Sequence, residues 1–89
     1  MQLQMTNRPT SLFVHVTQKE LEQVLSLREQ VNLQLSDPER RENMFVSYMV
    51  HFLGLEKEWI PRLLDPEECW QFICDNDREA LHRRVSTVH

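Results

Sequence analysis

A run of ten residues, from Met44 to Leu53, constrains the fold of this chain more than any other feature. Ser47 and His51 are the only polar residues in it. A helix that is apolar on nearly every side belongs at the centre of a structure. The run is too short to cross a bilayer. It must therefore be covered by other parts of a protein.

The length of the chain limits how completely this cover can be built. A domain of 89 residues buries only somewhat over about 60% of the surface of its unfolded chain. Either the other segments surround Met44 to Leu53 within one subunit, or part of this surface is buried against a second subunit or a partner. The sequence leaves both alternatives open.

Capping signals mark both ends of the central helix. Ser36 and Glu39 form an S-x-x-E capping box, and Pro38 stands in the first turn, where its missing N–H is not needed. Gly54 follows Leu53 as a left-handed C-cap, with Leu55 as its hydrophobic partner. The helix is therefore predicted to run from this box to Leu53.

Residues 11–16 are β-branched, aromatic and aliphatic, which predicts a short strand with Leu12, Val14 and Val16 on one face. No second strand is expected. The lone strand must then pair with a copy of itself in a dimer, lie extended over the helices, or be converted to helix. The residues do not decide among the three.

Thr17 and Glu20 form a T-x-x-E capping box, so a helix is predicted to begin near Gln18. Its apolar residues recur at the helical spacing of one buried stripe. The residues of this stripe are Leu21, Val24, Leu25, Val31 and Leu35.

Three more helical segments are expected after Gly54. Residues 55–64 contain Pro61 and predict a short or kinked helix. Residues 65–68 repeat the cap-plus-proline signal and predict a helix with an apolar stripe of Cys69, Phe72 and Ile73. Residues 76–79 form a third capping box, which predicts a final helix that frays towards His89.

These elements together predict an all-α fold, a small bundle of four to five helices with a possible short N-terminal strand. The polar residues 1–10 are predicted to be a flexible tail, and residues 11–89 a single helical domain. The N-terminus lacks the basic and apolar regions of a secretory signal, and two cysteines do not form a disulfide framework. A cytoplasmic protein is therefore expected.

Aromatic residues are concentrated around the central helix. Six of the seven lie between residues 45 and 72. Core packing accounts for most of them, but Trp and Tyr are also the residue types found at binding hot spots. Trp59 and Trp70 stand next to proline-marked helix starts, where surface is expected. The candidate partner-binding residues are Trp59, Trp70, Tyr48, Phe52 and His51.

No residue pattern predicts catalysis or a cofactor. Ser47 and His51 are one helical turn apart, but no third catalytic member and no glycine-rich oxyanion loop accompany them. Cys69 and Cys74 would point about 140° apart on a regular helix, so they would not share a metal. We therefore expect no enzyme activity, no cofactor, no metal and no small-molecule substrate.

The charge of the chain disfavours nucleic acids as partners. Fourteen acidic and ten basic residues give a net charge of −4, opposite to that of most proteins that bind phosphate backbones. The basic pairs Arg40-Arg41 and Arg83-Arg84 stand among carboxylates, which is typical of a solvated, partly ion-paired face.

Residues 11–53 are similar in element order to ribbon-helix-helix repressors, in which paired strands of a dimer read the major groove. Neither face of the strand supplies the Arg, Lys, Asn or Gln side chains that read base edges. A dimeric DNA-binding regulator is therefore the alternative hypothesis. The leading one is an acidic helical protein-binding module, a regulator, adaptor or inhibitor that acts as a homodimer or in a hetero-complex.

Overall fold

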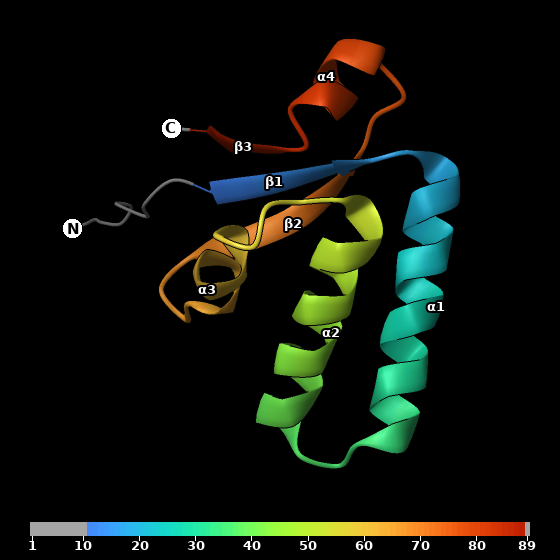
Figure 1. Cartoon of the computed structure of the whole chain (residues 1–89), viewed down its shortest axis with the longest axis vertical. Coiled ribbons are helices and arrows are strands. Elements are labelled where there is room, and N and C mark those ends of the chain that lie inside the picture. The colour runs from blue at the N-terminus through green and yellow to red at the C-terminus, as the bar shows by residue number, and fades with distance from the viewer. Residues whose placement is uncertain (1–10, 89) are drawn as a thin grey trace, which may run out of the picture.

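The computed structural model describes residues 11–88, which form three strands and four helices (Figure 1). In chain order these are β1 (Ser11–Val16), α1 (Gln18–Gln34), α2 (Pro38–Leu53), α3 (Trp59–Leu64), β2 (Cys69–Cys74), α4 (Arg78–His82) and β3 (Val85–Val88). The helices α1 and α2 form an antiparallel hairpin that runs across the direction of the strands (Figure 1).

The strands form one mixed sheet in the order β2-β1-β3. β1 pairs with β2 in parallel, so that Leu12 lies beside Trp70 and Val14 beside Phe72. It pairs with β3 in antiparallel, with Val14 opposite Val85. The strand predicted over residues 11–16 is confirmed with the same bounds. Its partners are two later segments of the same chain, which the sequence analysis had not identified as strands.

The prediction of an all-α helical bundle is therefore wrong, and the fold is a small α/β fold. The cap-plus-proline signal at Asp65 forms a turn: its carboxylate accepts the N–H of Glu67 at 2.9 Å and its carbonyl that of Glu68 at 3.0 Å. The next six residues, Cys-Trp-Gln-Phe-Ile-Cys, carry no charge and two aromatic rings. Such a segment suits a strand once a neighbouring strand is present to pair with it.

The last helix is also shorter than predicted. α4 comprises five residues, and its cap is Asp77, whose carboxylate accepts the N–H of Glu79 at 3.1 Å. Residues 85–88, expected to be a fraying helix end, pair with β1 instead. This pairing satisfies N–H and C=O groups on the second edge of β1.

The helix boundaries before residue 60 follow the sequence signals closely. The Thr17–Glu20 capping box is present, with reciprocal bonds of 3.0 and 2.9 Å. Asp37, one residue after the expected Ser36, caps α2. Gly54 ends α2 in the left-handed conformation with φ of 73°. The N–H of Leu55 then reaches the carbonyl of Val50 at 2.9 Å, which completes a Schellman C-cap.

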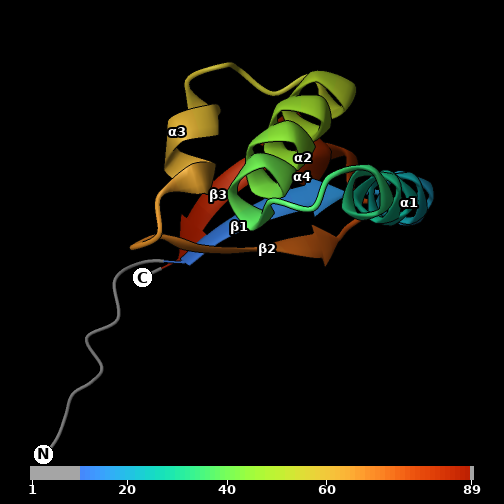
Figure 2. The same cartoon turned by 90° about the horizontal axis from the view of Figure 1, so that it is seen from below.

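The core lies between one face of the sheet and the helices. Leu12, Val14 and Val16 of β1 are fully buried. Figure 2 shows α2 and α3 on the same side of the strands, with α1 beyond the strand ends. Within α1, Val24 is buried but Leu25 is 52% exposed, because it lies about 100° around the helix from its neighbour. Leu25 is thus wrongly placed in the predicted stripe.

The cover of α2 is one-sided. Its buried residues are Phe45, Val46, Met49, Val50 and Leu53. Ser47, Tyr48, His51 and Phe52 are exposed. The apolar stretch from Met44 to Leu53 is therefore not enclosed on all sides by the described part of the chain.

Candidate functional site

The exposed side of α2 is formed by Ser47, Tyr48, His51 and Phe52, which we call the outer surface of α2. Tyr48 is 50% exposed and Phe52 is 46% exposed. Because residues three and four apart are neighbours on a helix, the four side chains form one continuous strip. Two large aromatic rings are thus presented to solvent by a helix whose opposite side is fixed in the core.

Two cavities lie along the side of this strip formed by Ser47 and His51, and both have Ser47 in their linings. One, of about 300 Å³, lies towards the start of α2 and is lined by Arg40, Asn43, Met44 and Ser47. The other, of about 230 Å³, lies between α2 and α3 and is lined by Ser47, Val50, His51, Gly54, Leu55, Lys57 and Ile60. Together they make a groove along α2, which we call the α2 groove.

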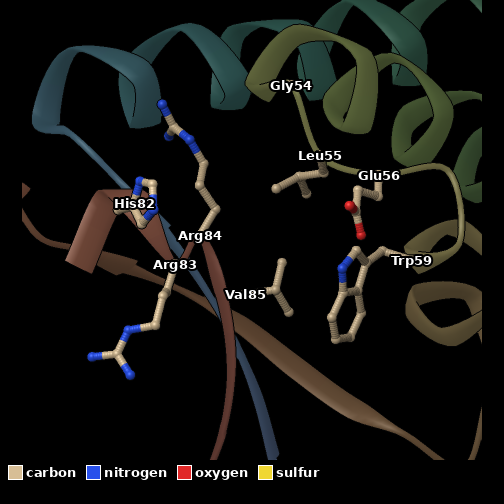
Figure 3. Close-up of a pocket in the computed structure, with 8 residues that line it drawn as sticks. All are labelled: Gly54, Leu55, Glu56, Trp59, His82, Arg83, Arg84 and Val85. Carbon is tan, nitrogen blue, oxygen red and sulfur yellow. The ribbon is translucent and has the colours of Figure 1, made fainter. Parts of the chain in front are cut away.

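A third cavity, of about 400 Å³, lies on the other side of the turn that ends α2. It shares Gly54 and Leu55 with the α2 groove. Figure 3 shows Leu55, Glu56 and Trp59 on one side of this cavity and the segment from His82 to Val85 on the other. The three cavities therefore follow one another along the surface.

The charges that line these cavities are mostly positive. Arg40 and Lys57 line the α2 groove, and no carboxylate belongs to its lining. Arg83 and Arg84 line the third cavity together with Glu56. None of the ion pairs in the described residues includes Arg40, Lys57 or Arg83. The α2 groove of this acidic protein is thus lined by two cations that form no ion pair within the described residues.

Arg84 is different, because it is held by Glu20. Its guanidinium donates two hydrogen bonds to this carboxylate, at 2.8 and 3.0 Å, and one to the carbonyl of His15 at 3.3 Å. The hydrogen bond from Arg84 is the main reason why the pKa of Glu20 is lowered from its ordinary value of 4.5. The pair fastens the start of β3 to the start of α1.

The five candidate residues of the sequence analysis fall into two groups. Tyr48, His51 and Phe52 lie together on the outer surface of α2. Trp59 and Trp70 are half-buried and pack against the core. The ring of Trp59 also has the Arg62 guanidinium over it at 5.0 Å and borders the third cavity.

Three polar side chains that were not singled out from the sequence lie close together at the sheet: His15, Asp75 and Ser86. The Nε2 of His15 is 2.9 Å from the Ser86 hydroxyl, and its Nδ1 is 3.6 Å from the Asp75 carboxylate. Ser, His and Asp stand in the order of a nucleophile relay. However, none of the three lines any of the cavities described above. The group therefore links the ends of the three strands.

Cys69 and Cys74 are exposed and not joined by a disulfide, and their odd spacing puts them on opposite faces of β2. Among residues 11–88, no three His, Cys, Asp or Glu side chains are grouped so that they could hold a metal ion. In the same range no helix has both the length and the apolar character needed to cross a bilayer.

Sequence reasoning missed the role of Arg40 and Lys57 in the groove. Arg40 was assumed to be partly paired with neighbouring carboxylates, but Glu42 pairs with Arg28 of α1 at 3.2 Å. A helical projection already places Arg40, Ser47 and His51 on one side of the helix. The position of Lys57 depends on how the α2–α3 turn folds, which no local pattern reveals.

Comparisons with models of protein families, with curated proteins and with solved structures find no match. The surface of α2 itself is therefore the basis on which a function can be assigned.

Proposed function

We propose that this chain is a protein-binding module that docks on its partner through the outer surface of α2. The observation that carries the proposal is the half exposure of Tyr48 and Phe52, one turn apart on the same helix. Large rigid side chains of this kind supply most of the affinity at many interfaces. Burial of the two rings against a partner also gives the apolar helix the cover that residues 11–88 leave incomplete.

The rigidity of the site supports the same function. Val46, Met49 and Leu53 hold the inner side of α2 in the core, so the backbone that carries the outer rings is already ordered before a partner binds. Such a surface serves a regulator, adaptor or inhibitor that occupies a site on another protein. The partner is either a second copy of this chain or a different protein, and no catalytic step is involved.

The alternative of a DNA-binding regulator has less support. In ribbon-helix-helix proteins the N-terminal strands of two subunits pair with each other. Here β1 is the central strand and has β2 and β3 on its two edges. Residues 11–16 therefore have no unpaired edge to offer to a second copy.

A cytoplasmic location is part of the proposal. Two exposed cysteines that are not joined by a disulfide are typical of a reducing compartment. Fractionation of the host cell tests this point independently of the partner.

Site-specific photo-crosslinking in the source cells tests the function. A photoreactive phenylalanine analogue replaces Tyr48, and the matched control replaces Gln30, which is exposed on α1. We expect a product of defined mass from position 48 only. Excess unlabelled wild-type protein should suppress it, and the double variant Tyr48→Ser/Phe52→Ser should not. Equal products from both positions, or equal suppression by both competitors, would rule out the proposed surface.

A further inference from the structure

The α2 groove also indicates the chemistry of the partner. We infer that the partner segment is an acidic amphipathic helix that lies along α2, with carboxylates near Arg40 and Lys57 and apolar side chains between them. This inference rests on the proposed function and adds to it the class of partner.

The charge of the groove supports an acidic partner. Its two full cations, Arg40 and Lys57, line opposite ends, and no carboxylate lines it between them. Neither cation belongs to an ion pair of the described residues. The whole chain has a net charge of −4, whereas the lining of the groove holds two cations and no carboxylate. Carboxylates on a partner complement these cations and set its orientation.

The lining between the two cations supports a partner with apolar side chains in its middle. Met44, Val50, Leu55 and Ile60 supply apolar surface, and Ser47 and His51 supply polar atoms without a full charge. Tyr48 and Phe52 adjoin this lining on α2. A partner whose middle is apolar and whose ends are acidic therefore matches the groove along its length.

The length of α2 also supports a helix as the partner. Arg40 and Gly54 stand fourteen residues apart along α2 and its C-cap, or about 21 Å at a rise of about 1.5 Å per residue. Lys57 lines the same cavity as Gly54, so a partner helix of about four turns extends from Arg40 to that cavity. A DNA duplex instead presents, on each strand, a phosphate about every 3.4 Å along its axis and needs several closely spaced cations. Two isolated cations on an apolar lining favour the acidic helix.

Three fluorescent probes test the inference by anisotropy. The first is an alanine- and leucine-rich peptide of about 15 residues with Glu at both ends, long enough to span the groove as a helix. The second has Lys in place of each Glu, and the third is a single-stranded DNA. We expect the Glu peptide to bind best and its affinity to fall as the salt concentration is raised.

Charge reversal locates the binding. In Arg40→Glu/Lys57→Glu we expect the affinity for the Glu peptide to fall roughly tenfold, since two weak exposed ion pairs are lost, and the Lys peptide to become the better ligand. The control Lys19→Glu/Arg78→Glu makes the same change in net charge at exposed residues outside the α2 groove. It should leave the preference for the Glu peptide unchanged.

Several outcomes overturn the inference. They are no measurable binding of the Glu peptide, equal binding of the Glu and Lys peptides, equal losses in both reversal variants, and tighter binding of DNA at the groove. Each of these leaves the crosslink from position 48 unaffected if α2 docks on a partner of other chemistry. Loss of that crosslink's specificity, in contrast, removes the proposed function itself.

Discussion

Phe45 and Phe52 belong to the same helix and are seven residues apart, yet the first is 1% exposed and the second 46%. At this spacing both point in nearly the same direction from the axis. The difference lies in their surroundings: Arg28 of α1 covers the ring of Phe45 at 4.5 Å from its centre, whereas Phe52 reaches solvent. Burial of Phe45 therefore stabilises the fold, whereas the exposed apolar area on the outer surface of α2 contributes little to the free energy of unfolding.

The largest expected effect is that of Phe45→Ala. Removal of a buried phenylalanine ring costs about 3–5 kcal/mol, which is a large part of the roughly 5–10 kcal/mol that a domain of this size possesses. The matched control is Phe52→Ala, for which we expect a loss of at most about 1 kcal/mol because half of the ring is already exposed. Urea denaturation followed by circular dichroism measures both. Equal losses would mean that the two rings are equally buried in solution.

A smaller effect is expected at Gly54, which lies on the exposed side but shapes the backbone. A Cβ at this position meets no atom within 4 Å, while φ is 73°. Gly54→Ala should therefore lose about 1–2 kcal/mol through backbone conformation alone. Gly54→Asn should lose less, since Asn tolerates the left-handed region better. If the denaturant midpoint stays unchanged in Gly54→Ala, the left-handed cap is not required.

The Glu20–Arg84 pair predicts a pH dependence. The pKa of Glu20 is lowered in the folded chain, so its stabilising contribution is complete above the ordinary value of 4.5 and is lost as the pH falls through the folded value. At neutral pH, Glu20→Gln should cost about 1 kcal/mol. The free energy of unfolding measured against pH should also fall less steeply below this value in the variant.

Glu22→Gln is the control for this titration. Glu22 is exposed, and its carboxylate accepts only a hydrogen bond of 3.3 Å from the Gln18 side chain. We expect its profile to follow that of the wild type. If the Glu20 and Glu22 variants give the same profile, the link between β3 and α1 does not contribute to acid stability.

The same contrast between regions explains how far the sequence predicts the structure. From residue 17 to residue 55, local signals decide the outcome: the Thr17–Glu20 box, the first turn at Pro38 and the left-handed Gly54 each act through bonds to residues a few positions away. After residue 64 the outcome depends on β1, more than 50 residues earlier in the chain. The segment Cys69–Cys74 is apolar enough for a buried helix face and becomes a strand because β1 offers an edge.

The candidate site shows the same limit. Tyr48, Phe52 and Trp70 were all chosen as aromatic residues, and the structure places Tyr48 and Phe52, together with His51, on the outer surface of α2. Trp70 was grouped with them by residue type, but its ring packs edge-on against Phe72 in the sheet, with ring centres 5.1 Å apart. Exposure is a property of the tertiary neighbours, so residue type could not separate the two groups.

The smallest expected effect on stability, and the most informative for function, is that of Tyr48→Ser/Phe52→Ser. Exposed substitutions usually change the free energy of unfolding by no more than about 0.5 kcal/mol each, so the double variant should stay folded and unfold near the wild-type midpoint. If the partner is a second copy, light scattering across a concentration series should show a dimer for the wild type and a monomer for the variant. If the partner is another protein, both should be monomers, and the variant alone should fail to compete for the crosslink at position 48. A variant that unfolds at much lower urea would show that these rings belong to the core, and one that still competes would show that α2 docks through other residues.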